Sequence, residues 1–309
     1  MVRVAGIDCG TNSVKMEIAD VSFSPFGPKI EIVVPRKVWT IRLGEGVDET
    51  RLLSPYALRR LKGSLESFKQ DISAFKAEKL RFVATSAVRD AKNEDDFRKI
   101  VEEVLGVEPE ILTGKEEGRL GFEAACMGMK EEKKLLVDLG GGSTEFSIGE
   151  GDVPSFVKSL DIGCVRIAEK FGFGSDPLPI EKREKAESFV QKAMKEVPIF
   201  SARRLIGISG SVAVVSFMAA GEKEFSPSKK LEIEREKGLE ACEKLMGMSE
   251  KEMEEYPLIP PLRRKVIRAG ALIWAQVLLS SPLHSYLFSD AALLDGVILD
   301  EARRLLRQC

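Results

Sequence analysis

Apolar residues along this chain follow two spacings, one typical of strands and one typical of helices. Ile30–Ile41 and Leu80–Thr85 have the pattern of strands, and Pro55–Phe75 carries apolar residues at helical intervals. The longest nearly continuous apolar run, Ala269–Leu279, is too short to cross a bilayer. The pattern therefore predicts an α/β protein without a membrane-spanning segment.

Two segments far apart in the chain repeat one pattern. In VAGIDCGTNSVKMEI and LLVDLGGGSTEFSI, an apolar run ends in aspartate, Asp8 or Asp138, and a glycine-containing turn follows. Apolar residues then alternate, which indicates a strand after the turn rather than a helix. Each segment is therefore predicted to be a β-hairpin, which distinguishes it from nucleotide-binding loops that lead into helices.

The tips of these hairpins have the composition of phosphate-binding turns. Glycine lets the backbone approach an anion closely, and serine or threonine adds a hydroxyl donor. An aspartate at the strand end could hold a hydrated Mg²⁺ that contacts the phosphate. The alternative is two ordinary turns, but the same pattern in two matching contexts favours phosphate binding. The predicted phosphate-binding tip residues are Gly10, Thr11, Asn12, Ser13, Gly140, Gly141, Gly142, Ser143 and Thr144.

A further candidate for anion binding follows the Leu80–Thr85 strand. Ser86 is placed to cap a short helix whose first turn contains Arg89. A cation at the start of a helix opposes the helix dipole, which would be explained by an anion in the same place. A solvated surface arginine is equally compatible with this segment.

Two adjacent glutamates begin the next predicted helix. Thr113 and Glu116 fit a capping box, which leaves Glu117 available for another role. Glu117 shares a face with small and apolar residues, so partial burial would raise the pKa of its carboxyl group and suit it to act as a general base. Both glutamates could also be simply the acidic residues that helix starts favour, and spacing leaves these interpretations open.

Two other segments receive structural interpretations. The turn at 207–211 could face a ligand, but it is interpreted mainly as a place of close strand–helix packing. The basic residues that begin the last long apolar helix are interpreted mainly as a solvated helix face, although they could extend a path for an anion. These basic residues are Arg263, Arg264, Lys265 and Arg268.

Composition narrows the function further. A chain of 309 residues predicts two domains, and the net charge of −2 provides no general attraction for DNA. The single histidine, His284, excludes histidine-rich metal sites. Five scattered cysteines are interpreted as buried thiols, and the first residues lack the pattern of a secretory leader. We therefore expect a cytoplasmic protein that binds neither DNA nor membranes.

In order along the chain, the motifs resemble those of the exopolyphosphatase/guanosine pentaphosphate phosphohydrolase family, within the actin/Hsp70/sugar-kinase superfamily. GIDCGTNSVKM and DLGGGSTEF resemble its two phosphate motifs, and ATSAVRDAKN, ILTGKEEGRL, SLDIGCVRIAEKF and FSDAALLDGVIL resemble its other signatures. The resemblance implies an α/β fold with two ribonuclease-H-like domains around an interdomain cleft. The expected first domain comprises residues 1–114 and 298–309, and the second comprises 115–297.

The resemblance also implies an activity and roles for individual residues. It implies Mg²⁺-dependent hydrolysis of the terminal phosphate of polyphosphate, or alternatively of guanosine pentaphosphate. Glu117 matches the catalytic glutamate of the family and Arg89 an arginine of its cleft. Asp138 and Glu145 match acids near metal and phosphate, and Asp8 is a further candidate metal ligand.

Other functions remain open at this point. The chain could be a kinase of the same superfamily, a non-catalytic module that binds polyphosphate or the alarmone, or an actin-like assembly protein. The GKEEGR segment favours hydrolysis over all three. The sequence does not distinguish the two phosphate substrates, and a homodimer is compatible with it.

Overall fold

A computed structural model describes residues 1–24, 27–129, 131–174, 176–226 and 230–307. Its contacts divide the chain into two units. Unit 1 comprises Met1–Ala124 and Leu293–Cys309, and unit 2 comprises Ala125–Ala292. Each unit contains one mixed β-sheet with helices, so the prediction of an α/β fold with two domains is confirmed.

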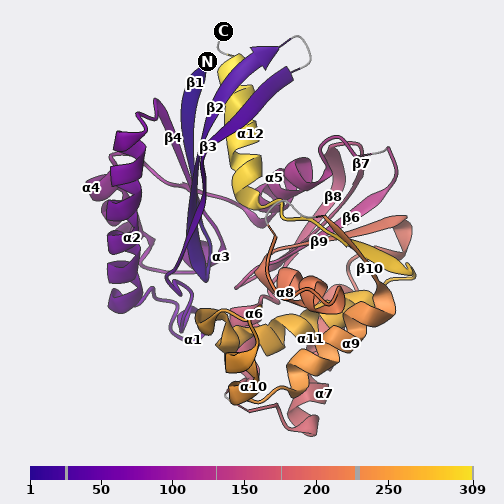
Figure 1. Ribbon diagram of the computed structural model, residues 1–309. Helices are drawn as coiled ribbons and strands as arrows, with labels where there is room; N and C mark the ends of the chain where they lie inside the picture. Colours follow the sequence, from indigo (N-terminus) through magenta and orange to yellow (C-terminus); the bar gives the residue numbers. More distant parts are fainter. Residues whose placement is uncertain (25–26, 130, 175, 227–229, 308–309) are drawn as a thin grey trace. The chain divides into compact units, whose positions relative to one another are not determined.

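Unit 1 is built on a sheet with the strand order β3-β2-β1-β4-β5 (Figure 1). The first three strands form an antiparallel meander, and β4 and β5 add parallel to β1. Helices α2 and α4 cover one face of the sheet and α12 covers the other. Its elements are β1 (Val2–Cys9), β2 (Ser13–Ser24), β3 (Gly27–Thr40), α1 (Val47–Thr50), α2 (Pro55–Ala74), β4 (Lys79–Ala84), α3 (Ser86–Arg89), α4 (Glu94–Leu105), β5 (Glu110–Ile111), α5 (Gly114–Cys126) and α12 (Leu293–Leu306).

Unit 2 repeats this topology. In the order β10-β11-β9-β6-β7-β8, strands β6, β7 and β8 form the antiparallel meander, and β9 and β11 add parallel to β6. Strand β10 extends the edge. Its elements are β6 (Lys134–Leu139), β7 (Thr144–Glu150), β8 (Val153–Leu160), α6 (Cys164–Phe171), α7 (Ile180–Met194), η1 (Ile199–Ser201), β9 (Arg204–Ile208), α8 (Gly210–Ala219), β10 (Leu231–Glu234), α9 (Arg235–Gly247), α10 (Glu250–Glu255), η2 (Pro261–Arg263), α11 (Arg264–Ser280) and β11 (Ser285–Phe288).

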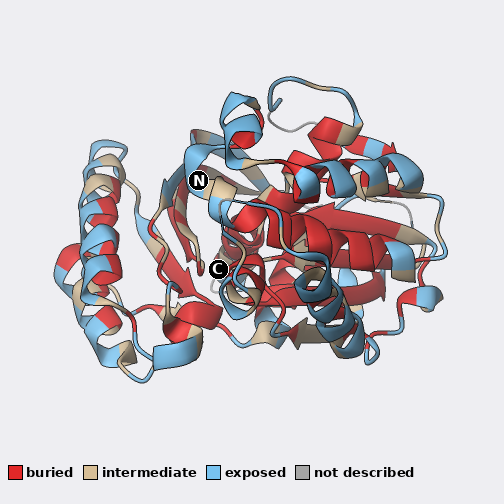
Figure 2. Cartoon of the chain, turned by 90° about the horizontal axis from the view of Figure 1, so that it is seen from below, coloured by how far each residue is buried: buried red, intermediate tan, exposed pale blue. Residues whose placement is uncertain are grey.

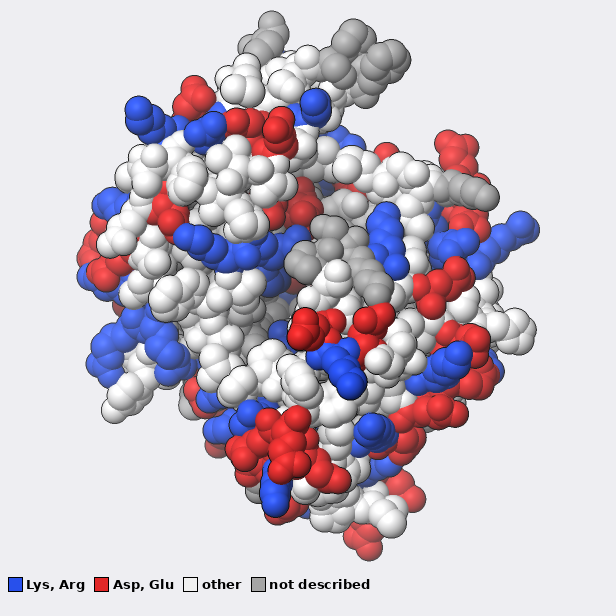
Figure 3. All heavy atoms as spheres, viewed as in Figure 1, with Lys and Arg blue, Asp and Glu red and all other residues white. Residues whose placement is uncertain are grey.

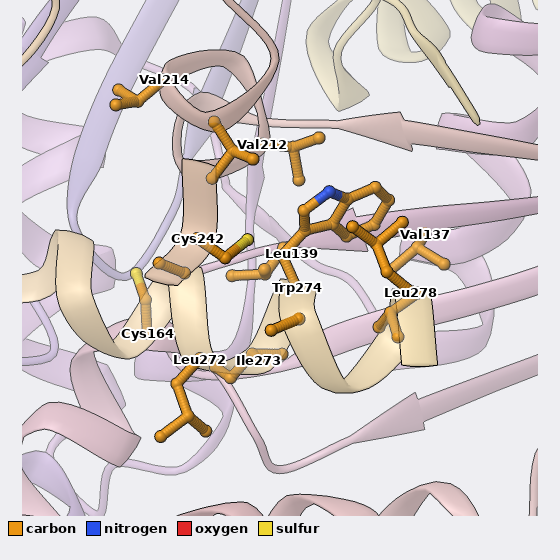
Figure 4. Close-up of a cluster of buried hydrophobic side chains, with 14 of the residues drawn as sticks. Val137, Leu139, Cys164, Val212, Val214, Cys242, Leu272, Ile273, Trp274 and Leu278 are labelled. Atoms are coloured by element: carbon orange, nitrogen blue, oxygen red, sulfur yellow. The ribbon is translucent and has the colours of Figure 1, made fainter. Parts of the chain in front are cut away.

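Helix α11 is the centre of the helical layer in unit 2. Every residue from Val266 to Leu278 is buried, as expected for a helix that is apolar on all sides and surrounded by other elements. Its Trp274 and Leu278 lie near Val137 of β6 (Figure 4), and the Trp274 ring meets that of Tyr286 edge to face at 5.1 Å. This arrangement explains the long apolar run in the sequence as a core helix.

The boundary between the units differs from the prediction of 1–114 with 298–309 and 115–297. It lies after Ala124 and before Leu293, so most of α5 and all of α12 belong to unit 1. The reason is packing, because Leu120 of α5 forms one apolar cluster with Leu293 and Val297. A Cβ at Gly296 would lie only 2.2 Å from the carbonyl oxygen of Leu120, so the two helices touch through backbone.

Buried ion pairs also attach α12 to its sheet. The Arg81 guanidinium, with 4% of its side chain exposed, lies 2.8 Å from Asp300 and 3.1 Å from Glu110. Burial by itself would raise the pKa of the Asp300 carboxyl group, but Arg81 lowers it overall. Breaking such a buried pair leaves an uncompensated charge, so these contacts fix the position of α12.

The surface is mixed in character. Figure 2 shows buried residues in the strands and inner helices, with exposed residues along the outer turns, and acidic and basic side chains are interspersed on the face in Figure 3. Among the helices that the structure describes, none combines the length and apolar character needed to span a membrane. Within the same described part, the prediction of buried thiols is confirmed for Cys9, Cys126, Cys164 and Cys242, whereas Cys309 lies outside it.

Candidate active site

Both glycine-containing segments are β-hairpins, as predicted. Cys9 pairs with Val14 in unit 1, and Leu139 pairs with Thr144 in unit 2, so the predicted tips lie between paired strands. We call the turn at residues 10–13 the first tip and the turn at residues 140–143 the second tip.

The first tip is held by the segment that follows β3. The carbonyl oxygen of Thr11 accepts a hydrogen bond from Gly44 at 2.8 Å, and that of Asn12 accepts bonds from Ile41 at 3.0 Å and Arg42 at 2.9 Å. The Thr11 hydroxyl also bonds to the Ser86 hydroxyl at 2.8 Å. Its carbonyl groups and one hydroxyl are therefore bound by protein.

The second tip is held in the same way by the segment that follows β8. Cys164 donates to the carbonyl oxygen of Gly140 at 3.0 Å, and Val165 donates to that of Gly141 at 2.8 Å. The Arg166 guanidinium donates to the carbonyl oxygen of Gly142 at 2.8 Å. This tip therefore rests on the beginning of α6.

The packing of the second tip against the start of α6 requires glycine at position 163. A Cβ at Gly163, the residue before α6, would lie 2.2 Å from the carbonyl oxygen of Gly141. No side chain could fit at that position without moving the tip. The glycine therefore reflects a close approach between two backbones.

The binding of the carbonyl groups leaves amide groups at both tips available. Within the described residues, the amides of Thr11, Asn12, Gly141 and Gly142 donate no hydrogen bond to another residue. Adjacent backbone N–H groups in a turn form a concave site suited to an anion. The geometry is thus compatible with the predicted phosphate contacts.

The two hairpins differ in the residue opposite the aspartate. In unit 1, Asp8 pairs across the strands with Lys15, and the Lys15 ammonium lies 3.0 Å from the Asp8 carboxylate. In unit 2, Asp138 occupies the matching register position opposite Glu145. Directly opposite residues lie on one face of a sheet, so unit 2 places two carboxylates together where unit 1 has an ion pair.

The predicted metal ligands Asp138, Glu145 and Asp8 differ in how well they suit a metal ion. Asp138 and Glu145 provide an all-oxygen donor set of the kind Mg²⁺ prefers, and Glu145 is 1% exposed and accepts a hydrogen bond from the Ser159 hydroxyl at 2.7 Å. Asp8 fits a metal less well because Lys15 already neutralises it. The described residues contain no group of three or more His, Cys, Asp or Glu side chains able to hold a metal, so a metal at this pair would take its other ligands from water or substrate.

Arg89 and Glu117 lie together in unit 1. The Arg89 guanidinium donates to the carbonyl oxygen of Leu112 at 2.6 Å and lies 3.5 Å from the Glu117 carboxylate, whose residue is 8% exposed. The prediction that Ser86 caps this helix is wrong, because Thr85 is the N-cap and Ser86 instead bonds to Thr11. Arg89 ends this four-residue helix, so its position does not oppose a helix dipole.

The neighbouring glutamate has a structural role. The Glu116 carboxylate accepts hydrogen bonds from the Thr113 amide at 2.9 Å and hydroxyl at 2.7 Å, and Glu116 donates its amide to that hydroxyl. The predicted capping box is therefore confirmed. These bonds, first that of the backbone amide, lower the pKa of the Glu116 carboxyl group.

In unit 2, the start of helix α8 and the Arg263 side chain also lie near the second tip. Ser209 donates its hydroxyl to the carbonyl oxygen of Leu139 at 2.6 Å, which places the start of α8 beside that tip. The Arg263 guanidinium packs on this start, since a Cβ at Gly210 would lie 2.2 Å from it. For Gly207 the predicted close packing is confirmed, because a Cβ there would lie 2.5 Å from the Trp274 ring.

The structure thus groups the predicted site residues by unit. Unit 1 brings together the first tip, Arg89 and Glu117 through the Thr11–Ser86 bond, and unit 2 brings together the second tip, Asp138 and Glu145. The sequence analysis missed Lys15 as the partner of Asp8. The signal was available, because a hairpin that pairs Cys9 with Val14 also places residue 15 opposite residue 8.

Comparison with known proteins identifies one family over nearly the whole chain. The sequence model of the Ppx/GppA phosphatase family matches residues 22–305. The chain is 33% identical to Exopolyphosphatase 2 of Mycobacterium tuberculosis over 98% of this chain and 99% of that protein. It is also similar to the crystal structure of an exopolyphosphatase-like protein (35% identity, TM-score 0.90, covering 98% of this chain and 100% of the other). The crystal structure of the Aquifex aeolicus member of the Ppx/GppA family gives 28% identity and a TM-score of 0.81, covering 98% of both chains.

Proposed function

The chain belongs to the Ppx/GppA phosphatase family and is a phosphoanhydride hydrolase, and we propose that it releases the terminal phosphate of inorganic polyphosphate through a water activated by Glu117. The observation that carries the mechanism is the nearly buried Glu117 carboxylate beside Arg89, in the unit that also contains the first tip. The choice of polyphosphate is supported by the similarity, over almost the whole length of both chains, to a protein named Exopolyphosphatase 2.

Glu117 and Arg89 take different roles in this proposal. Glu117 accepts the proton of the attacking water, which general bases in enzymes do with rate effects of about 10²–10⁴-fold. Arg89 holds a phosphate oxygen with its guanidinium, while its bond to the Leu112 carbonyl oxygen fixes its orientation.

Unit 2 supplies groups that bind phosphate and metal. The amides of Gly141 and Gly142 bind the oxygens of the phosphate chain. Asp138 and Glu145 would hold Mg²⁺, which offsets negative charge on the phosphate oxygens. Most of the rate enhancement then comes from positioning and electrostatic stabilisation.

A comparison of substrates tests the activity. Phosphate release is measured on long polyphosphate, triphosphate, guanosine pentaphosphate and ATP, each with and without Mg²⁺. We expect the largest kcat/KM on polyphosphate and dependence on Mg²⁺. A larger kcat/KM on guanosine pentaphosphate would identify the alarmone as the substrate, and binding without phosphate release would make the chain a binding module.

Adjacent glutamates provide a matched pair of variants for the mechanism. Glu117→Gln should lower kcat by about 10²–10⁴-fold with little change in substrate binding, because the amide is close in shape but is not a base. Glu116→Gln, one position earlier, should keep kcat within a few-fold, since glutamine also completes a capping box. Near-normal turnover by Glu117→Gln would show that Glu117 is not the base.

A further inference from the structure

The basic residues that begin α11 are not simply a solvated helix face. Arg268 is 2% exposed and Arg264 is partly buried, whereas Lys265 is exposed. The interpretation from sequence is therefore wrong for Arg268. All three of these basic residues line a pocket.

The pocket has a volume of about 240 Å³ and lies wholly in unit 2. It is lined by Phe173 and Gly174, which follow α6, by Glu250 and Met253 of α10, and by residues at the start of α11. This volume is large enough for several water molecules. A phosphate group with part of its hydration shell would fit.

The charge of the lining is unbalanced. Arg264, Lys265 and Arg268 contribute three positive charges, and Glu250 contributes the one negative charge among the lining residues that the structure describes. Helix α11 also begins here without an acidic residue in its first turn, although the exposed amides of a helix start favour negative charge. Both features favour an anion in the pocket.

Arg268 is fixed in the wall of the pocket by its backbone contacts. Its guanidinium donates to the carbonyl oxygen of Met248 at 3.1 and 2.5 Å and to that of Gly174 at 2.7 Å. Burial lowers the pKa of this guanidinium, so an anion nearby would stabilise its charged form. A cation held in this way is already oriented for a ligand.

Arg264 contributes an unsatisfied donor. Its Nη1 lies 3.0 Å from the Glu254 carboxylate, but its Nε is buried and has no hydrogen-bond partner among the described residues. Buried donors of this kind are uncommon in native proteins and usually have an acceptor that is not a protein atom. An oxyanion in the adjacent pocket would provide one.

We propose that this pocket binds a phosphoryl oxyanion, either free inorganic phosphate or the end of a short phosphate chain. The site is distinct from the second tip, although α6 connects the two. That helix begins at Cys164, which bonds to Gly140 of the tip, and ends two residues before Phe173 of the pocket. Binding in the pocket does not depend on the proposed hydrolysis.

Calorimetric titration of the full chain in the absence of Mg²⁺ tests this site, with inorganic phosphate and triphosphate as separate probes. Lys265→Glu and Arg264→Gln should each weaken one binding event by about tenfold or more. Lys251→Glu is the matched control, because Lys251 is exposed on α10, does not line the pocket, and undergoes the same change of charge. Melting temperatures establish that each variant is folded, and Lys265→Glu, at an exposed position, should remain folded even if Arg264→Gln does not.

The two probes distinguish the sources of the phosphoryl group. Equal loss with both probes indicates a site for a single phosphate, and a loss confined to triphosphate indicates a site for a chain end. Unchanged binding in the folded Lys265→Glu variant, or an equal loss in Lys251→Glu, would overturn the proposal. Phosphate release by the unaltered protein is measured separately, so failure of the proposed hydrolysis would be seen independently of this result.

Discussion

The two glycine hairpins have the same backbone but different charge. In both, an antiparallel pair ends at a short tip whose carbonyl groups are bound by the segment after the third strand of the meander. At paired positions across the three strands of each meander, unit 1 has Asp8, Lys15 and Val38, whereas unit 2 has Asp138, Glu145 and Ser159. A lysine in one unit occupies the place of a glutamate in the other.

In the proposed function, this difference confines metal binding to the second hairpin. The Asp8–Lys15 ion pair carries no net charge, so the first tip has no excess negative charge from this pair beside its amides. Asp138 and Glu145 bring two like charges together, which is unfavourable unless a cation or a proton lies with them. In the proposed function, one exchange of charge thus adds a metal site to a repeated hairpin.

Among changes to the two hairpins, exchanging that charge should have the largest effect. Glu145→Lys would give unit 2 the ion pair of unit 1, and we expect kcat for Mg²⁺-dependent phosphate release to fall by about 10²–10³-fold, because a positively charged side chain would occupy the proposed metal position. The measurement is initial rate against Mg²⁺ concentration. Lys15→Glu is the reciprocal change, and an equal fall there in kcat for Mg²⁺-dependent phosphate release would contradict the assignment of the metal to the second hairpin.

Adding one methyl group to each tip should have a smaller and unequal effect. A Cβ at Gly140 would lie 2.9 Å from the carbonyl oxygen of Ser143, whereas a Cβ at Gly10 would lie 3.3 Å from that of Ser13. Gly140→Ala should therefore displace its tip and lower kcat/KM by about 10- to 100-fold. Gly10→Ala should lower kcat/KM only by about a few-fold. Equal losses in kcat/KM would show that the two tips are equally constrained.

Removing the hydroxyl of Ser159, which lies beside Glu145 on the third strand of the meander in unit 2, should have the smallest effect. Ser159→Ala deletes the 2.7 Å hydrogen bond to Glu145, and loss of such support for a metal ligand typically weakens metal affinity by about tenfold. Ser155→Ala on the same strand is the control, because its hydroxyl bonds to the backbone of Ile148. An unchanged Mg²⁺ concentration at half-maximal rate in Ser159→Ala would remove Glu145 from the metal site.

The parts of the site predicted from sequence are those that depend on short-range patterns. The hairpins follow from alternation beside a glycine turn, and the capping box of Thr113 and Glu116 spans only three residues. Both are local, because the interacting groups are brought together by one element or one turn. For the same reason, the core position of α11 could be expected from its apolar sequence.

The parts that sequence did not reveal depend on contacts between distant residues. Ser86 fits a cap by local rules, yet its hydroxyl bonds to Thr11, which is 75 positions away. The observed unit boundary differs from the predicted one because Leu120 packs against Leu293 and Val297. No local pattern specifies which distant surface a helix will cover, so such contacts become visible only in the folded chain.

The position of α12 has a consequence for how the protein is made. This helix covers the sheet of unit 1, yet the whole of unit 2 lies between it and the rest of its own unit in the chain. At synthesis rates of about 5–20 residues per second, those intervening residues take on the order of ten to thirty seconds to emerge from the ribosome. During that time the apolar face formed by Val4, Gly6 and Val21 has no cover. The cover on this face of the sheet in unit 1 is therefore completed only when the last residues of the chain emerge.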